Sequence, residues 1–467
     1  MTRFTATLAL LLVSVRLTSA QQLNPELQTK ITQAIQGVIA KTGVPSASVG
    51  IVQNGEIVFN QAFGDARLVP PLQATAAMSY PIGSISKQFT ATCLLLLQQD
   101  GKLTLDDKVA RWFPNLTRAR DITLRELLSH TSGYEDYAPQ DYTIPAWMHP
   151  TDPTRLVTEW AGKPLDFEPG TAWQYSNTNF VLAALIIERA SGIPYFRFLK
   201  TRVLEPLALT GALNLDTDRN RVEPQGYERR ALAPLRPAIL EAPGWYYGDA
   251  SLAMPVADLL KWDLSIINRT LLKPASYATF ETEVKLKDGT GTGYGLGIDV
   301  LNRDSRRILA HSGEVGGFVA QNTVWPDDKV AIAVLTNQEA SPAASAIANA
   351  ITPLLFAPKP ASTLPRTTTL EDQVKKIIIG LQAGILNRAL FTPDANFYFS
   401  PETLEDFSSS LKPLGAVTSV VQKRNALRGG MTARNFEVAF VSGTTITLST
   451  YWMKDSRLEQ FLVEGKN

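Results

Sequence analysis

The sequence predicts an α+β protein in which one antiparallel sheet, flanked by terminal helices, carries an inserted helical lobe and is followed by a small C-terminal α+β domain. Strand-like segments lie near the start of the chain, within residues 46–63, and return within residues 295–337. The long segment between them is dominated by helical patterns and loops. Strands from the two ends of such a unit pair most simply in a single sheet, with the intervening helices packed on it as a lobe.

The first elements of the sheet domain are predicted to be a helix and a hairpin. Apolar side chains recur at helical spacing in residues 25–41. Two β-rich runs, residues 46–52 and 56–63, then flank Asn54 and Gly55. Asn-Gly between two such runs is typical of a tight hairpin turn. The strands predicted to complete the sheet, and the helix predicted to close the domain, are residues 295–301, 307–311, 318–325, 330–337 and 343–356.

A segment rich in Pro, Thr and Ser, residues 357–369, predicts a linker between a main domain, residues 21–356, and a second domain, residues 370–467. The second domain is predicted to contain one helix and three strands, at residues 370–390, 436–441, 445–451 and 458–463. No group of residues in it suggests a nucleophile. We interpret Arg428-Gly429-Gly430-Met431 as a turn and Tyr451-Trp452 as packing material, so we expect an accessory domain that packs on the first domain or holds a partner.

Composition and the N-terminus indicate an exported globular protein. The chain has 467 residues, 45% of them hydrophobic, with a net charge of +1 and no basic stripe, so nucleic acid is not expected as a partner. Residues 1–20 show the positive start, apolar stretch and small-residue end of a signal peptide, with cleavage after Ala20. We therefore expect a secreted or periplasmic protein. No later apolar run reaches the roughly 20 residues of a transmembrane helix.

The first candidate for chemistry is the tetrad Ser84-Ile85-Ser86-Lys87, which follows a Pro/Gly break and opens a long apolar run. Residues three apart in a helix share a face, so Ser84 Oγ and Lys87 Nζ can meet. A serine hydroxyl becomes a good nucleophile when a neighbouring base takes its proton. A desolvated lysine has a lowered pKa and can be that base. By itself, however, the tetrad fits an ordinary helix start better, and its spacing recurs at Ser409 and Lys412.

Two later motifs distinguish the first tetrad from the second. Tyr175-Ser176-Asn177 lies in a polar loop just before a predicted helix, and His311-Ser312-Gly313 ends a predicted strand. Tyr175 can relay a proton, and we expect a neighbouring lysine ammonium to lower its pKa. Asn177 can orient the lysine and a substrate carbonyl, while the strand at Gly313 can offer backbone N–H groups to an oxyanion. Taken singly, these residues fit an aromatic core residue, a helix cap and a strand-end histidine.

In this order and placement the motifs resemble the serine β-lactamase and penicillin-binding-protein superfamily. The resemblance is to the branch with class C β-lactamases, D-alanyl-D-alanine carboxypeptidases, D-aminopeptidases and related esterases. It extends over about residues 25–356 and includes Leu-Leu-Ser-His-Thr-Ser-Gly at 127–133, Pro-Leu at 206–207 and Tyr-Gly-Leu-Gly at 294–297. The resemblance implies a β-lactamase/transpeptidase-like fold, a small-molecule or short-peptide substrate, and no cofactor or metal.

The resemblance also implies a role for each site residue. Ser84 would be the acylated nucleophile, Lys87 its base partner and Tyr175 the second acid/base. The substrate-binding residues would be Asn177, His311, Ser312 and Gly313. The backbone N–H groups of Ser84 and Glu314 would form the oxyanion hole, and His130 and His149 would be structural.

One position departs from the family pattern. His311 stands where β-lactamases of this branch usually carry lysine. Histidine is mostly neutral near pH 7, so it would recognise a substrate carboxylate more weakly and in a pH-dependent way. This favours a carboxypeptidase or esterase type over a dedicated β-lactamase.

Other classes of function fit the sequence less well. A Ser-His-Asp hydrolase is disfavoured because Gly-x-Ser-x-Gly is absent and the chain has three histidines. A metal hydrolase lacks both a His-x-x-x-His motif and a cysteine pair. A non-catalytic sensor or scaffold of the same fold stays open as an alternative. Aromatic loops at residues 134–147 and 245–247 are expected to rim the cleft, but they leave open whether the substrate is a D-amino-acid peptide, a small ester or a β-lactam.

Overall fold

The computed structural model describes residues 23–356, 369–428 and 431–466. The predicted signal peptide and nearly all of the predicted linker lie outside the described residues. Within the described ranges, no helix is long and apolar enough to cross a membrane.

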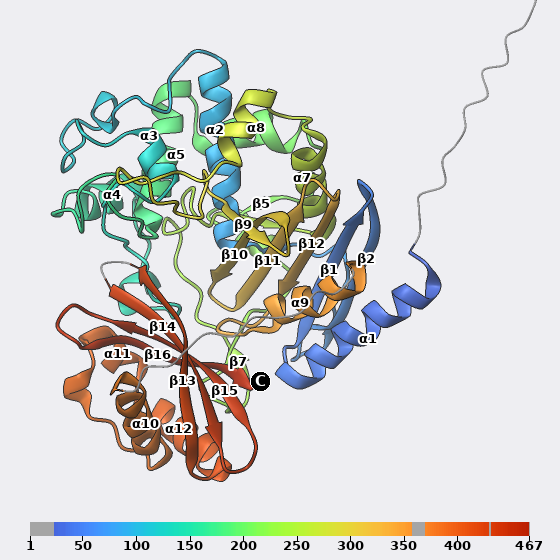
Figure 1. The fold of residues 1–467 in the computed structure, drawn as a ribbon, viewed down its shortest axis with the longest axis vertical. Helices are drawn as coiled ribbons and strands as arrows, with labels where there is room; N and C mark the ends of the chain where they lie inside the picture. The colour runs from blue at the N-terminus through green and yellow to red at the C-terminus, as the bar shows by residue number, and fades with distance from the viewer. Residues whose placement is uncertain (1–22, 357–368, 429–430, 467) are drawn as a thin grey trace, which may run out of the picture.

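A seven-stranded sheet in the order β3-β2-β1-β12-β11-β10-β9 forms the centre of the main domain (Figure 1). Every neighbouring pair is antiparallel. The N-terminal hairpin joins the later strands through β1 and β12, with Ala47 opposite Thr336, so the two strand-rich ends of the domain share one sheet as predicted. The strands are β1 Ser46–Gln53, β2 Glu56–Arg67, β3 Leu72–Gln73, β9 Asp299–Arg303, β10 Arg306–Val315, β11 Phe318–Trp325 and β12 Val330–Thr336.

Helices cover both faces of this sheet. The terminal helices α1, Pro25–Thr42, and α9, Ala343–Leu355, pack together on one face, where they bury an apolar layer that includes Ile31 and Ile347. Helix α7, Val256–Asn268, lies against the opposite face. It approaches so closely that a Cβ on Gly50 of β1 would stand 2.6 Å from a methyl carbon of Leu260. The predicted flanking by terminal helices is therefore confirmed.

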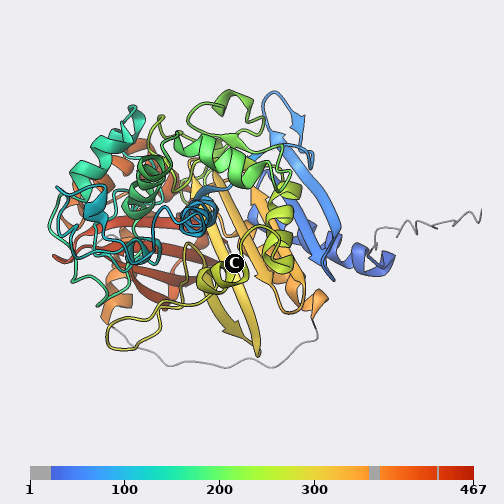
Figure 2. The same cartoon turned by 90° about the horizontal axis from the view of Figure 1, so that it is seen from above.

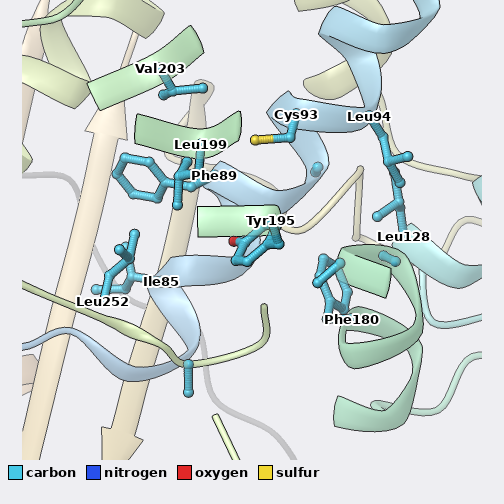
Figure 3. Close-up of a cluster of buried hydrophobic side chains, with 14 of the residues drawn as sticks. Ile85, Phe89, Cys93, Leu94, Leu128, Phe180, Tyr195, Leu199, Val203 and Leu252 are labelled. Carbon is cyan, nitrogen blue, oxygen red and sulfur yellow. The ribbon is translucent and has the colours of Figure 1, made fainter. Parts of the chain in front are cut away.

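The helical lobe is organised around α2, Ser86–Gln99, whose residues from Ser86 to Leu97 are all buried. Phe89, Cys93 and Leu94 of α2 belong to one apolar cluster with Phe180, Leu199 and other side chains of the surrounding helices (Figure 3). Because α2 is enclosed on every side, its N-terminus is held rigidly beside the sheet. The other lobe helices are α3 Leu124–Leu128, α4 Pro153–Trp160, α5 Asn177–Ser191, α6 Tyr195–Leu199 and α8 Pro274–Phe280. Short strands and helical turns join them: β4 Tyr80–Pro81, η1 Gly83–Ile85, η2 Val109–Arg111, η3 Pro145–Met148, η4 Lys200–Leu204, β5 Leu213–Asn214, η5 Arg219–Arg221, β6 Tyr227–Glu228, β7 Arg236–Pro237 and β8 Leu252–Met254.

One strand of the main sheet was predicted too early. The prediction placed it at residues 295–301, whereas β9 begins at Asp299. Before it, Gly297 adopts a left-handed conformation with a φ of 74°, and a Cβ there would stand 2.7 Å from the carbonyl oxygen of Lys87. This segment therefore passes close to the start of α2 instead of pairing in the sheet.

The C-terminal domain is a separate small α+β unit with its own core (Figures 1 and 2). Its four strands form an antiparallel sheet in the order β13-β14-β15-β16. The predicted helix at 370–390 is too long, because α10 ends at Gln382 and Gly384 follows with a φ of 70°. Strand β13 and two helices were not predicted. The elements are α10 Thr369–Gln382, η6 Arg388–Leu390, α11 Pro393–Tyr398, α12 Pro401–Leu411, η7 Lys412–Leu414, β13 Val417–Arg428, β14 Met431–Phe440, β15 Thr445–Trp452 and β16 Leu458–Lys466.

Polar contacts attach the C-terminal domain to the main domain at two places. Arg236 makes a two-pronged ion pair with Asp406 of α12, with N···O distances of 2.6 and 3.0 Å. At the second place, Tyr142 donates a hydrogen bond to the backbone oxygen of Glu459 at 2.7 Å, and Gln140 bonds to the Glu459 carboxylate at 2.9 Å. The expected packing of the two domains on each other is present.

Candidate active site

Ser84 stands at the mouth of α2, on the helical turn η1 that links β4 to the helix. Its side chain is half-buried, whereas Lys87, one turn further on, is fully buried. Lys87 Nζ lies 2.9 Å from Ser84 Oγ, so the spacing of the tetrad brings the two groups into contact as predicted. A hydroxyl that is reachable and already bonded to an amine meets the first requirement of a serine nucleophile.

Lys87 is held in place by two further hydrogen bonds. Its Nζ contacts Asn177 Oδ1 at 2.7 Å and the backbone oxygen of Asp249 at 3.1 Å. Burial lowers the pKa of Lys87 to about 8, although the nearby carboxylates of Asp249 and Asp136 act in the opposite direction. An amine with a pKa this close to neutrality can both accept and return a proton, which general acid–base catalysis requires.

Tyr175 completes the group around Ser84. Its ring centre lies 5.0 Å from Lys87 Nζ, and its hydroxyl is near enough to Ser84 for the serine side chain to affect its pKa. Burial raises the pKa of Tyr175 above its ordinary value, and the nearby Ser84 side chain and the charge of Arg428 offset this only in part. The expectation of a lowered pKa was therefore wrong, because the loss of solvation outweighs the neighbouring positive charges. Tyr175 is a protonated phenol near neutral pH.

The His130 ring packs against the ring of Tyr175. The two rings lie 4.3 Å apart, and His130 Nδ1 accepts a hydrogen bond from the backbone N–H of Ser176 at 3.1 Å. Burial holds the pKa of His130 well below its usual range, so the ring is neutral. These contacts fit the structural role expected for it.

Strand β10 lies on the other side of Ser84. The two segments come close at two glycines, Gly313 of β10 and Gly83 next to Ser84. A Cβ on Gly313 would stand 1.9 Å from the carbonyl oxygen of Ile82 and 3.0 Å from Ser84 N, and a Cβ on Gly83 would stand 2.5 Å from Glu314 N. The backbone N–H groups of Ser84 and Glu314 therefore lie close together, and only glycine allows the two chains to come this near. Ser312, next along the strand, is exposed to the cleft.

His311 is buried at this strand and carries no charge near neutral pH. Its Nδ1 lies 2.5 Å from the backbone oxygen of Ser312, and its Nε2 lies 2.9 Å from the Tyr294 hydroxyl. A carbonyl oxygen can only accept, so the proton is on Nδ1 and Nε2 accepts from the tyrosine. Burial, assisted by the charge of Lys87, lowers the pKa of His311 to about 4. The position therefore supplies no cation to the cleft.

Asn177 serves chiefly to hold Lys87. While its Oδ1 contacts the lysine, its Nδ2 donates to Asp136 Oδ2 at 3.3 Å and to the backbone oxygen of Ala138 at 3.1 Å. The predicted orientation of the lysine is present in this geometry. Asn177 also lines the cleft. Its predicted role in binding the substrate stays a prediction.

A cavity of about 490 Å³ opens in front of Ser84. The expected aromatic rim is largely present, but Tyr134 and Tyr247 point elsewhere, toward Thr117 and Glu188. The aromatic residues that line the cavity are Tyr137, Tyr142, Trp147, Trp173, Tyr175, Trp245, Tyr246, Tyr294 and Tyr451.

The C-terminal domain also lines this cavity. The residues that it contributes are Arg424, Ala426, Arg428, Ala433, Asn435, Ser449, Tyr451 and Glu464. Arg428 and Met431 do flank the turn between β13 and β14 as predicted, and Tyr451 is buried, but Arg428 and Tyr451 also line the cavity, which was not predicted. A β-hairpin more than 250 residues from Tyr175 in sequence forms a wall of its cleft, which no local pattern reveals.

The family model named Beta-lactamase matches residues 31–354. The chain belongs to the beta-lactamase family. It is a serine hydrolase of the β-lactamase fold, which agrees with the resemblance in the sequence.

The proteins that this chain resembles have names that indicate several different activities. Penicillin-binding protein 4* of Bacillus subtilis is 28% identical over 311 residues, which cover 63% of this chain and 68% of the relative. A D-aminopeptidase of Gluconobacter oxydans is 26% identical over 405 residues, covering 84% and 75%. The crystal structure of a D-stereospecific amidohydrolase from Streptomyces sp. is 26% identical, with a TM-score of 0.58, and covers 70% of this chain and 98% of that one.

The sequence did not point to two acidic residues of this beta-lactamase-family site. Asp136 accepts hydrogen bonds from the backbone and side chain of Asn177, and Asp249 accepts from the Tyr137 hydroxyl at 3.0 Å. Burial raises the pKa of Asp249 to about 7, while the charge of Lys87 opposes that rise. Asp136 follows the Leu-Leu-Ser-His-Thr-Ser-Gly stretch by three residues, which is the nearest signal the sequence offers.

Proposed function

We propose that the protein is a secreted serine hydrolase that forms an acyl-enzyme on Ser84 and acts on small D-amino-acid amides, esters or short peptides. The geometry around Ser84 is the observation that carries the proposal: its hydroxyl contacts Lys87, and Ser84 and Tyr175 line the same open cavity. The proposal that the protein is secreted rests only on the signal-peptide pattern of residues 1–20.

In the proposed acylation, neutral Lys87 takes the proton of Ser84 as Oγ attacks the carbonyl carbon. The N–H groups of Ser84 and Glu314 would stabilise the oxyanion that forms. Tyr175, a protonated phenol, would donate a proton to the leaving nitrogen or oxygen, and the proton that Lys87 took from Ser84 would restore the phenol. Water would then hydrolyse the ester, with the same groups acting in reverse.

Two carboxyl groups in the cleft suit a substrate that carries an amine. His311 is neutral, so the ammonium that would suit a substrate carboxylate is missing at that strand. Asp299 and Glu464 line the cavity, and burial raises the pKa of these two carboxyls to about 6 and about 7. A bound ammonium would favour their ionised forms. The D-aminopeptidase and D-stereospecific amidohydrolase among the similar proteins support the same class of substrate.

A turnover panel tests the substrate class. We expect D-alanine p-nitroanilide to be hydrolysed at least a hundredfold faster than its L-enantiomer, and p-nitrophenyl acetate to be cleaved slowly. We expect nitrocefin to be the poorest substrate. Preference for the L-enantiomer, or for nitrocefin over every amide, would contradict the proposed substrate.

Covalent labelling separates the enzyme from the scaffold alternative. Fluorophosphonate should add one adduct to the wild-type protein by intact mass, and peptide mapping should place it on Ser84. Ser84→Ala should remain unlabelled, whereas the matched variant Ser409→Ala should be labelled like the wild type. If fluorophosphonate and β-lactam probes all leave the wild type unmodified, the scaffold reading is favoured.

A further inference from the structure

The tip of the C-terminal β13–β14 hairpin reaches Tyr175. Arg428, the last residue of β13, forms an isolated parallel β-bridge with Tyr175. Its guanidinium carbon lies 5.7 Å from the centre of the Tyr175 ring. Tyr175 therefore has two cations near its ring, because Lys87 Nζ is 5.0 Å from the same centre. A guanidinium at this distance from an aromatic ring is attracted to it.

A network spanning both domains holds Arg428 there. Arg428 Nη1 lies 3.0 Å from Asp141 Oδ1 of the main domain and also bonds to the Tyr451 hydroxyl. Tyr451 donates in turn to Asp141 Oδ2 at 2.5 Å. Gln460 adds two bonds to Asp141, one from its Nε2 at 2.9 Å and one to the backbone N–H at 2.7 Å.

The loop that carries Asp141 leads directly to the reacting groups. Five residues earlier in the same loop, Asp136 binds the backbone and side chain of Asn177, and Asn177 binds Lys87. The C-terminal domain thus contacts the active site in two ways: directly, through Arg428 on Tyr175, and indirectly, through the loop that holds Asn177.

Arg428 is not suited to binding a substrate anion. Asp141 already satisfies part of its charge, and the surrounding cavity wall contains the carboxyl groups of Asp299, Glu314 and Glu464. A role toward Tyr175 and Lys87 fits the contacts better.

We propose that the C-terminal domain is part of the active site, and that Arg428 is a positioning residue that holds Tyr175 against Ser84 and sets the charge around Tyr175 and Lys87. This inference rests on the proposed function. The titratable and charged groups that face Tyr175 and Lys87 are Asp136, Asp249, His130, His311, Tyr294 and Arg428. Arg428 comes from the C-terminal domain, whereas the other five belong to the main domain.

The charge of Arg428 opposes protonation of both groups. It lowers the pKa of Lys87, adding to the larger effect of burial, and it counteracts the burial that raises the pKa of Tyr175. Removing it should leave less neutral Lys87 at pH 7. The activity should then rise at a higher pH than in the wild type.

Substitutions in the full-length protein test this. Arg428→Met keeps the length of the side chain and removes its charge. We expect kcat for the best substrate of the panel to fall roughly ten- to hundredfold, with KM changed less than threefold and the acid limb of the kcat profile moved up by roughly half to one pH unit. Arg428→Lys should restore the position of the limb. Lys423→Met, on the same strand but exposed and paired with Glu437, should match the wild type.

A second variant should shift the acid limb of the kcat profile in the opposite direction. Asp141→Asn removes the negative charge that balances Arg428, so the acid limb should move to lower pH. The proposal is overturned if Arg428→Met and Asp141→Asn keep the wild-type limb, or if Arg428→Met and Arg428→Lys lose the same activity with an unshifted limb. That second result would mean that the hairpin only packs there. Should Arg428→Met not fold by circular dichroism, Asp141→Asn and Arg428→Lys decide. Failure of fluorophosphonate to label wild-type Ser84 would instead contradict the proposed function.

Discussion

The chain contains two Ser-x-x-Lys tetrads, and they lie at opposite ends of their helices. Ser84 and Lys87 stand at the N-terminus of α2, where the helix presents free N–H groups and a partial positive charge that favour a developing oxyanion. Ser409 and Lys412 stand at the C-terminus of α12, where free carbonyl groups oppose negative charge. Identical spacing therefore gives opposite electrostatics.

Burial separates the two tetrads as clearly as helix position does. Lys87 is fully buried and contacts Ser84, Asn177 and Asp249, whereas Ser409 and Lys412 are exposed. The Ser409 hydroxyl donates to the backbone oxygen of Asp406 at 3.3 Å, a local helix contact. A serine–lysine pair becomes reactive when the surrounding fold removes water from the lysine and leaves the serine reachable.

Substituting the two lysines tests the difference between the tetrads most strongly. Lys87→Ala should lower kcat/KM by about 10³- to 10⁴-fold, because Ser84 loses the group that takes its proton. Lys412→Ala should stay within about twofold of the wild type. Steady-state turnover of D-alanine p-nitroanilide, with circular dichroism to verify folding, provides the measurement. Equal losses in the two variants would remove the distinction between the tetrads.

Tyr175→Phe should have the next largest effect. Burial keeps the phenol protonated at neutral pH, so the variant keeps the ring but loses the proton donor for the leaving group. We expect kcat to fall about 10²- to 10³-fold for an anilide, and less for a p-nitrophenyl ester, whose leaving group needs little protonation. Comparing the two substrates is the measurement. An equal loss on both would assign Tyr175 to positioning of Ser84 instead of proton donation.

The sequence predicts the parts of this fold and site that depend on local pattern. The Asn54-Gly55 hairpin and strands β11 and β12 lie where their patterns indicate, and the tetrad before an apolar run does open a buried helix. The direction of the Tyr175 pKa was wrong because burial is a property of the assembled fold. The position of Arg428 beside Tyr175 was not predicted, because the two residues are more than 250 apart in the chain. Such contacts depend on how two domains dock.

The pH dependence of acylation sharpens the comparison further. With the pKa of Lys87 lowered to about 8, the rate of fluorophosphonate labelling of Ser84 should rise about tenfold per pH unit below pH 8 and level off above it. This probe has no titrating group of its own, so the limb reports the enzyme. A rate that is flat between pH 6 and pH 9 would show that Lys87 is not the base.

The smallest expected effect is on the free energy of unfolding, which measures the burial of Lys87 most directly. The pKa of Lys87 is about 8 in the folded chain and about 10.5 when unfolded, so between these values the unfolded chain binds more protons and folding becomes more stable as pH rises. Below pH 8 the buried lysine costs stability, on the order of 3 kcal/mol, which Lys87→Met avoids. The free energy of unfolding from urea titrations should therefore favour Lys87→Met over the wild type at pH 7, and the gap should close toward pH 10. Lys412→Met, the matched control on the exposed tetrad, should show no such trend. A gap that does not change with pH would mean that the pKa of Lys87 is the same in the folded and the unfolded chain, and that packing alone separates the variants.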